Sequence, residues 1–197
     1  YEAVSMPIVF VDRRLDEMGQ ISVIEADHYA GGKLAAEYLI ACGCRQITCI
    51  RGPQELSSGK RRYEGYREVC RQHSMKERFV DSTYKYEDGA KAAEEVLRRY
   101  PDTDGIIACN DMTAVSVYKV LQKRGYRVPD DIQIIGFDGV KFGRFLTPEL
   151  TTVAQPIKEM GKCAVQMILG TVKELPRDRE MKFPVMLIKG ETTKNKM

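Results

Sequence analysis

The chain has 197 residues, a net charge of +3, 43% hydrophobic residues and 30% charged residues. This balance is typical of a globular protein with one domain or two small ones, and no apolar run approaches the roughly 18 residues that a membrane span needs. The mildly basic charge does not by itself indicate nucleic-acid binding. The six cysteines form no Cys-x-x-Cys pair, which favours a reducing, cytoplasmic environment over a disulfide framework.

In chain order, short apolar runs alternate with segments of helical periodicity. Strands are predicted at residues 8–11, 22–25, 46–50, 79–82, 105–109 and 132–137, and helices at 33–42, 57–72, 87–100 and 111–124. This alternation predicts a mainly parallel sheet with right-handed crossovers. The run 132–137 is almost entirely apolar, as expected for a strand that helices cover on both faces.

Three helix ends are assigned from individual residues. Gly43 is a natural C-terminal stop, and the pair Ser57-Ser58 offers a cap for the helix 57–72. For the helix predicted at 111–124, either Asn110 or Asp111 could be the N-terminal cap. We expect Asp111 to cap it and Asn110 to face a ligand cleft.

The last part of the chain indicates a second lobe. Residues 151–155 are predicted as a strand-like crossover, 173–182 as a polar loop and 183–188 as a final strand, and Ile157, Met160, Ala164 and Ile168 form the stripe of a helix. A late crossover suggests that the chain leaves one lobe, enters another and returns. We therefore predict a partial N-terminal lobe of residues 1–27 and 151–172, and a C-terminal lobe of residues 28–150 and 173–197.

Four polar residues stand where strands, or the turns between strands and helices, end: Asp12, Arg62, Asn110 and Asp138. In an open α/β sheet, ligands bind beyond the carboxyl ends of the strands. Carboxylates, a guanidinium and a carboxamide make strong paired hydrogen bonds to neighbouring hydroxyls. Such groups at strand ends suit the binding of a polyol ligand in a cleft.

Each of these residues also has a purely structural interpretation. Asp12 with Arg13 could form a surface ion pair or a turn, and Arg62 lies in a basic run that could be a solvated helix face. Asp138 could form a turn with Gly139. With only two histidines, far apart in the sequence, no metal site is expected, and we predict no cofactor and no catalytic residue.

Six motifs follow one another along the chain in a fixed order. They are a strand that ends in Asp12-Arg13, Gly43-Cys44-x-x-Ile47, Ser58-x-x-x-Arg62-x-x-Gly65-Tyr66, Asn110-Asp111-x-x-Ala114, Val128-Pro129-x-Asp131-x-x-x-x-Gly136-Phe137-Asp138, and Leu146-Thr147-Pro148-x-Leu150-Thr151-Thr152-Val153. In order and spacing they resemble the effector-binding domain of the LacI/GalR family of bacterial transcription repressors. One departure is Cys44, which stands where the family usually has histidine.

The resemblance implies a periplasmic-binding-protein-like α/β fold of parallel sheets flanked by helices, in two lobes with one incomplete. It implies ligand contacts at the four polar residues, with Arg13, Ser58 and Gln155 as supports. The implied partners are a small-molecule effector, a sugar or sugar-like compound, and a second copy in a homodimer. Operator DNA would be bound through a helix-turn-helix headpiece that this sequence does not contain, and no membrane association is expected. We thus expect a fragment that lacks the headpiece and part of the first lobe.

Two other functions remain open at this point. A sugar-binding protein of a transport system would share the two-lobed fold, although the motif from Leu146 to Val153 and the thiols favour the repressor. The carboxylates Asp12 and Asp138 could serve as the acid pair of a glycoside hydrolase. No arrangement of nucleophile, base and orienting group can be recognised, however, which argues against an enzyme.

Overall fold

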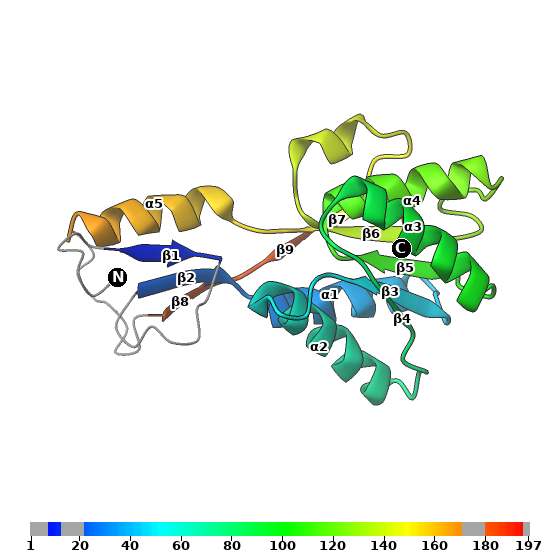
Figure 1. Cartoon of the computed structure of the whole chain (residues 1–197), viewed down its shortest axis with the longest axis horizontal. Helices are drawn as coiled ribbons and strands as arrows, with labels where there is room; N and C mark the ends of the chain where they lie inside the picture. Colours follow the sequence, from blue (N-terminus) through cyan, green and yellow to red (C-terminus); the bar gives the residue numbers. More distant parts are fainter. Residues whose placement is uncertain (1–7, 13–21, 171–179, 195–197) are drawn as a thin grey trace.

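The computed structural model of the chain describes residues 8–12, 22–170 and 180–194, which form two lobes, each built around its own sheet (Figure 1). In the smaller sheet, β2 (Ser22–Ala26) lies between β1 (Val9–Val11) and β8 (Glu180–Phe183). The described strand pairs are parallel except for β7 with β9, which confirms the predicted α/β class. The strands of the larger sheet are, in sheet order, β4 (Phe79–Asp81), β3 (Ile47–Arg51), β5 (Gly105–Ala108), β6 (Gln133–Asp138), β7 (Thr151–Ala154) and β9 (Met186–Ile188).

Helices cover both faces of the larger sheet. On one face, α1 and α2 share an apolar cluster with the strands, in which Leu39 packs with Ile135. On the other face, α3 and α4 share a second cluster, in which Val117 packs with Ile134. Because both isoleucines of β6 are fully buried, the prediction of a strand covered on both faces is confirmed. These helices are α1 (His28–Ala41), α2 (Ser57–Gln72), α3 (Tyr86–Arg99) and α4 (Asp111–Lys123).

The smaller sheet is covered on one face by α5 (Ile157–Ile168) (Figure 1). The helix packs against Ile24 and Ala26 of β2 through Met160, Cys163, Ala164 and Met167. The two central residues of the predicted stripe are therefore buried. The prediction is wrong at the ends of the stripe, because Ile157 and Ile168 are 58% and 46% exposed.

Within the described residues, the chain passes between the sheets near Asp27, near residues 155–156 and near residues 184–185. The predicted lobe is therefore wrong for two strands. β7, predicted in the N-terminal lobe, pairs with β6 in the larger sheet, and β8, predicted in the C-terminal lobe, pairs with β2 in the smaller sheet. The single strand predicted at 183–188 is two strands. Pro184 separates them, and a proline has no N–H to donate to a strand ladder. The remaining lobe boundaries stay predictions.

Helix α1 begins five positions before its predicted start at Lys33, and this extension brings it close to α2. The side chain of Asp27 caps the helix by accepting a hydrogen bond from the N–H of Ala30 (2.9 Å). Gly32 faces α2 so closely that a Cβ there would lie 2.0 Å from the carbonyl oxygen of Arg62. A glycine is therefore needed for this contact, which places the start of α1 beside Arg62.

Substitution of Gly32 by alanine is expected to destabilise the protein by about 1–3 kcal/mol, because the added methyl group overlaps backbone atoms and pushes α1 and α2 apart. Gly161→Ala is the matched control: Gly161 also lies within a helix, and a Cβ there would meet nothing within 4 Å. That change is expected to stabilise the protein by roughly 0.5–1 kcal/mol through helix propensity. Urea unfolding of both variants measures the difference, and equal effects would contradict the close packing.

Candidate functional site

Arg62, from the first turns of α2, lies at the centre of a polar cluster between the lobes. It is 9% exposed, and its guanidinium donates hydrogen bonds in three directions. Nε donates to Nδ1 of His28 (3.3 Å), Nη1 to the carbonyl oxygen of Cys109 (2.5 Å) and Nη2 to Oδ1 of Asp138 (3.2 Å). The guanidinium carbon also lies 3.7 Å from the centre of the Phe137 ring. Arg62 thus belongs to the interior of a site, and the solvated-face interpretation is wrong.

Asp138, the last residue of β6, brings a carboxylate into this cluster. Its φ of +114° is a conformation that non-glycine residues rarely adopt. Oδ1 accepts hydrogen bonds from Nη2 of Arg62 and from Nε2 of Gln155 (2.7 Å). Burial raises the pKa of Asp138, although the nearby guanidinium opposes that shift. The strained turn thus aims the carboxylate at Arg62.

Asp12 follows β1 in the smaller lobe and extends the cluster across to that lobe. Its Oδ1 lies 2.6 Å from Nε2 of His28, the first residue of α1, and also accepts a hydrogen bond from the N–H of Ala26 (3.4 Å). Burial by itself raises the pKa of Asp12, but the contacts with His28 and the charge of Arg62 outweigh it, and the pKa lies below its ordinary value. A continuous chain of contacts therefore joins Asp12, His28, Arg62, Asp138 and Gln155.

Ser58 and Asn110 lie in a neighbouring group around Tyr84. Oγ of Ser58 is 3.2 Å from the hydroxyl of Tyr84, and Nδ2 of Asn110 donates to the backbone carbonyl of Tyr84 (3.3 Å). The predicted cap at Ser57-Ser58 is wrong, because the N-cap residue of α2 is Leu56, which makes no side-chain cap hydrogen bond. The structure therefore places Ser58 beside Tyr84 rather than at a helix cap.

The capping assignment at the start of α4 is reversed from the prediction. Oδ1 of Asn110 accepts a hydrogen bond from the N–H of Thr113 (2.8 Å), so Asn110 is the cap. Asp111 is fully buried, and it accepts hydrogen bonds from Oγ1 of Thr152 (2.6 Å) and the N–H of Val140 (2.8 Å). Because α4 begins at Asp111, Asn110 holds the N-cap position, and the carboxylate of Asp111 instead accepts from Thr152 of β7.

Of the predicted site residues, Asp12, Arg62, Asp138 and Gln155 are brought together, and Arg13 lies outside the described residues. Sequence reasoning missed His28 and Tyr84. His28 follows a strand and opens a helix, so the strand-end argument used for the carboxylates could have selected it. No comparable signal marked Tyr84, which lies in the loop after β4.

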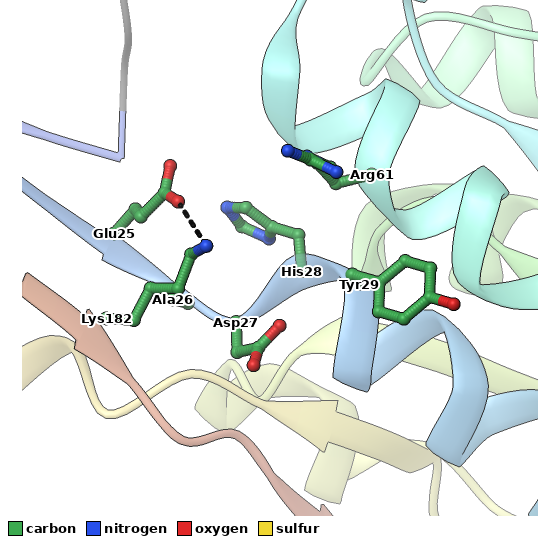
Figure 2. Close-up of a pocket in the computed structure, with 7 residues that line it drawn as sticks. All are labelled: Glu25, Ala26, Asp27, His28, Tyr29, Arg61 and Lys182. Carbon is green, nitrogen blue, oxygen red and sulfur yellow. Dashed lines mark ion pairs between the residues drawn. The ribbon is translucent and has the colours of Figure 1, made fainter.

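A pocket of about 180 Å³ lies beside this cluster and shares only His28 with it (Figure 2). Its wall carries charges of both signs, and Glu25 pairs with Lys182 (3.7 Å). Its lining residues are Glu25, Ala26, Asp27, His28, Tyr29, Arg61 and Lys182. In the described part of the chain, no three histidine, cysteine or acidic residues are grouped to hold a metal ion. Among the same residues, no helix has the length and apolar character to cross a membrane.

Residues 36–193 match the family of periplasmic binding protein-like domains. The chain belongs to this family. It is 35% identical over 195 residues to the ribose operon repressor of Halalkalibacterium halodurans and 36% identical over 196 residues to that of Bacillus subtilis. Each alignment covers 98% of this chain, but the chain spans only 58% and 59% of the length of these relatives.

Solved structures of transcriptional regulators are also similar to this chain. The chain is similar to the transcriptional regulator CelR in complex with cellobiose, with a TM-score of 0.82 and 31% identity over 93% of this chain and 58% of that one. A LacI family regulator from Enterococcus faecalis with bound ribose gives a TM-score of 0.83 and 29% identity over 95% of this chain and 68% of that one. The resemblance to LacI/GalR regulators, predicted from the motifs, is confirmed.

Proposed function

We propose that this chain is the effector-binding domain of a LacI-type transcription regulator and that it senses a sugar between its two lobes. The observation that carries the proposal is the chain of contacts from Asp12 in the smaller lobe, through Arg62, to Asp138 and Gln155. Ser58 and Asn110 would border the same site at Tyr84, and Arg13 would support it. The ribose and cellobiose complexes of similar regulators favour a sugar over other polyols.

The two carboxylates are arranged to accept hydrogen bonds from sugar hydroxyls. In the described residues, the hydrogen bonds that the side chains of Asp12 and Asp138 accept all end on Oδ1. Oδ2 of each carboxylate can therefore accept from a ligand, and the two side chains are 30% and 25% exposed. A sugar that bound both would connect the lobes through charge-assisted hydrogen bonds.

Signalling would follow from unequal affinity for two lobe arrangements. A ligand that binds one arrangement better shifts the population towards it, whereas equal affinity for both would change nothing. In the whole regulator this shift would alter operator binding by a helix-turn-helix headpiece. A cytoplasmic homodimer fits that role, since a two-fold dimer matches a palindromic operator.

An enzymatic role is not proposed. The relatives are repressors, and the two carboxylates of the possible hydrolase pair are held by His28 and Arg62. Those contacts favour the charged form of each carboxylate, although burial raises the pKa of Asp138, whereas a glycoside hydrolase needs one protonated acid. The pair is thus better suited to binding than to proton transfer.

The proposal predicts that a sugar stabilises the full-length protein against heat. D-ribose at about 100 times its dissociation constant is expected to add about 2.7 kcal/mol, or roughly 5–10 °C in Tm. Cellobiose and D-galactose, tested in parallel, report the size and stereochemistry that the site accepts. Scanning calorimetry measures the shift. If no sugar moves Tm, the sugar-sensing proposal fails.

A further inference from the structure

His28 occupies the position that connects the two charged groups of the cluster. It is 3% exposed, and it contacts Asp12 of the smaller lobe through Nε2 and Arg62 of the larger lobe through Nδ1. Its ring also packs 6.0 Å from the ring of Phe137. Figure 2 shows its imidazole on the wall of the neighbouring pocket. Both ring nitrogens are thus engaged, which distinguishes it from a ring that only fills space.

The two contacts determine where the imidazole carries its proton. Nε of an arginine can only donate, so Nδ1 of His28 must accept from Arg62 and carries no hydrogen. Nε2 therefore holds the hydrogen and donates it to the carboxylate of Asp12 (2.6 Å). A doubly protonated ring would instead place an N–H against the N–H of the guanidinium.

We propose that His28, as the neutral Nε2–H tautomer, is a positioning residue of the sugar site. It fixes the carboxylate of Asp12 relative to the guanidinium of Arg62, which lies in the other lobe. The ring thereby sets the separation at which groups from the two lobes meet one sugar. This role rests on the proposed function, because it concerns the geometry of that same site.

The tautomer can be measured without any sugar. These 197 residues contain two histidines, and the second, His73, is exposed, so comparison of the wild-type nitrogen NMR spectrum with those of His73→Gln and His28→Gln assigns the signals of the His28 imidazole. At neutral pH, we expect one protonated and one unprotonated ring nitrogen, with the hydrogen on Nε2. A ring protonated at Nδ1, or at both nitrogens, would overturn the proposal.

Variants at His28 then test the role in binding, with D-ribose as the probe and isothermal calorimetry as the measurement. His28→Phe keeps the packing on Phe137 but makes neither polar contact, and it is expected to weaken ribose binding at least tenfold. His28→Gln keeps a donor that can reach Asp12 and is expected to recover a substantial part of that loss. Wild-type affinity in the phenylalanine variant would overturn the proposal.

Two further outcomes separate this proposal from the proposed function. If His28→Phe does not fold, His28→Asn is tested in its place. The asparagine amide is shorter than that of glutamine, so we expect it to accept from Arg62 without reaching Asp12. The asparagine variant must then bind ribose more weakly than the glutamine variant. If the wild-type protein binds none of the sugars, the proposed function fails and the role in binding fails with it. The tautomer measurement then decides by itself whether His28 bridges the lobes.

Discussion

Arg62→Lys is expected to abolish the sugar response while the protein remains folded. The lysine ammonium is a single point charge, so it cannot donate at once to His28, to the carbonyl of Cys109 and to Asp138, as the guanidinium does. It also cannot stack flat on Phe137. We expect the affinity for D-ribose to fall at least 100-fold, or about 2.7 kcal/mol. The free energy of unfolding should fall by only about 1–3 kcal/mol, since a cation still faces Asp138.

The control for this change is Arg71→Lys in the same helix, where the arginine side chain is 76% exposed. It is expected to alter stability by less than about 0.5 kcal/mol and to leave ribose binding unchanged. Calorimetric titration and urea unfolding of both variants give the comparison. Ribose binding of wild-type strength in Arg62→Lys would remove Arg62 from the site.

Alanine at position 62 is a less informative change than lysine. From the motif alone, an alanine variant should lose the ligand and keep its fold. The structure shows that Asp138 is largely buried and paired with Arg62, so removing the cation leaves a carboxylate without its partner. Such a loss costs about 3–5 kcal/mol, a large part of the stability of a typical domain. Lysine separates binding from folding better.

The order of strands and helices was predictable because apolar periodicity is a local property. The largest error in a predicted helix boundary is the start of α1, and it arises from tertiary packing. Gly31 and Gly32 lower helix propensity, so periodicity alone starts the helix at Lys33. In the folded protein, Gly32 permits the contact with Arg62, and the packing of α1 on α2 outweighs the propensity of two residues. That requirement is not visible from one segment by itself.

The candidate site was predictable only as a set of strand-end residues. The strand-end argument found Asp12 and Asp138, because within each sheet parallel strands bring their carboxyl ends to one edge, and these two residues follow strands of the two different sheets. It could not predict which group donates a hydrogen bond to each carboxylate oxygen. Asn110 and Tyr84 are 26 positions apart in the sequence, and their contact depends on how the loop after β4 folds back. The role of His28 likewise requires knowing that α2 lies beside it.

Asp111 shows how the interior supports the site. Its carboxylate accepts a hydrogen bond from the N–H of Val140 and so holds the turn that follows Asp138. Gly136 leaves room for it, since a Cβ there would lie 2.3 Å from Oδ1 of Asp111. Burial raises the pKa of Asp111 to about 6, the charge of Asp138 adds to the shift, and the hydrogen bonds from Thr152 and the backbone oppose it.

This raised pKa makes stability depend on pH in a direction that can be tested. Between the ordinary value of 3.8 and about 6, the folded protein binds more protons at Asp111 than the unfolded chain does. The stabilisation from the protonated carboxyl is therefore complete below pH 3.8 and is lost as the pH rises through 6. Its full size is about 3 kcal/mol, at 1.36 kcal/mol per pKa unit.

Asp111→Asn is expected to remove this dependence, because the carboxamide resembles the protonated acid and does not titrate. Urea unfolding of both proteins across this pH range should show the wild type losing up to about 3 kcal/mol relative to the variant as the pH rises. Asp130→Asn, at a carboxylate that is 61% exposed, should instead follow the wild type at every pH. A difference that stays constant with pH would mean that Asp111 titrates alike in the folded and unfolded states. That result would contradict the raised pKa of Asp111.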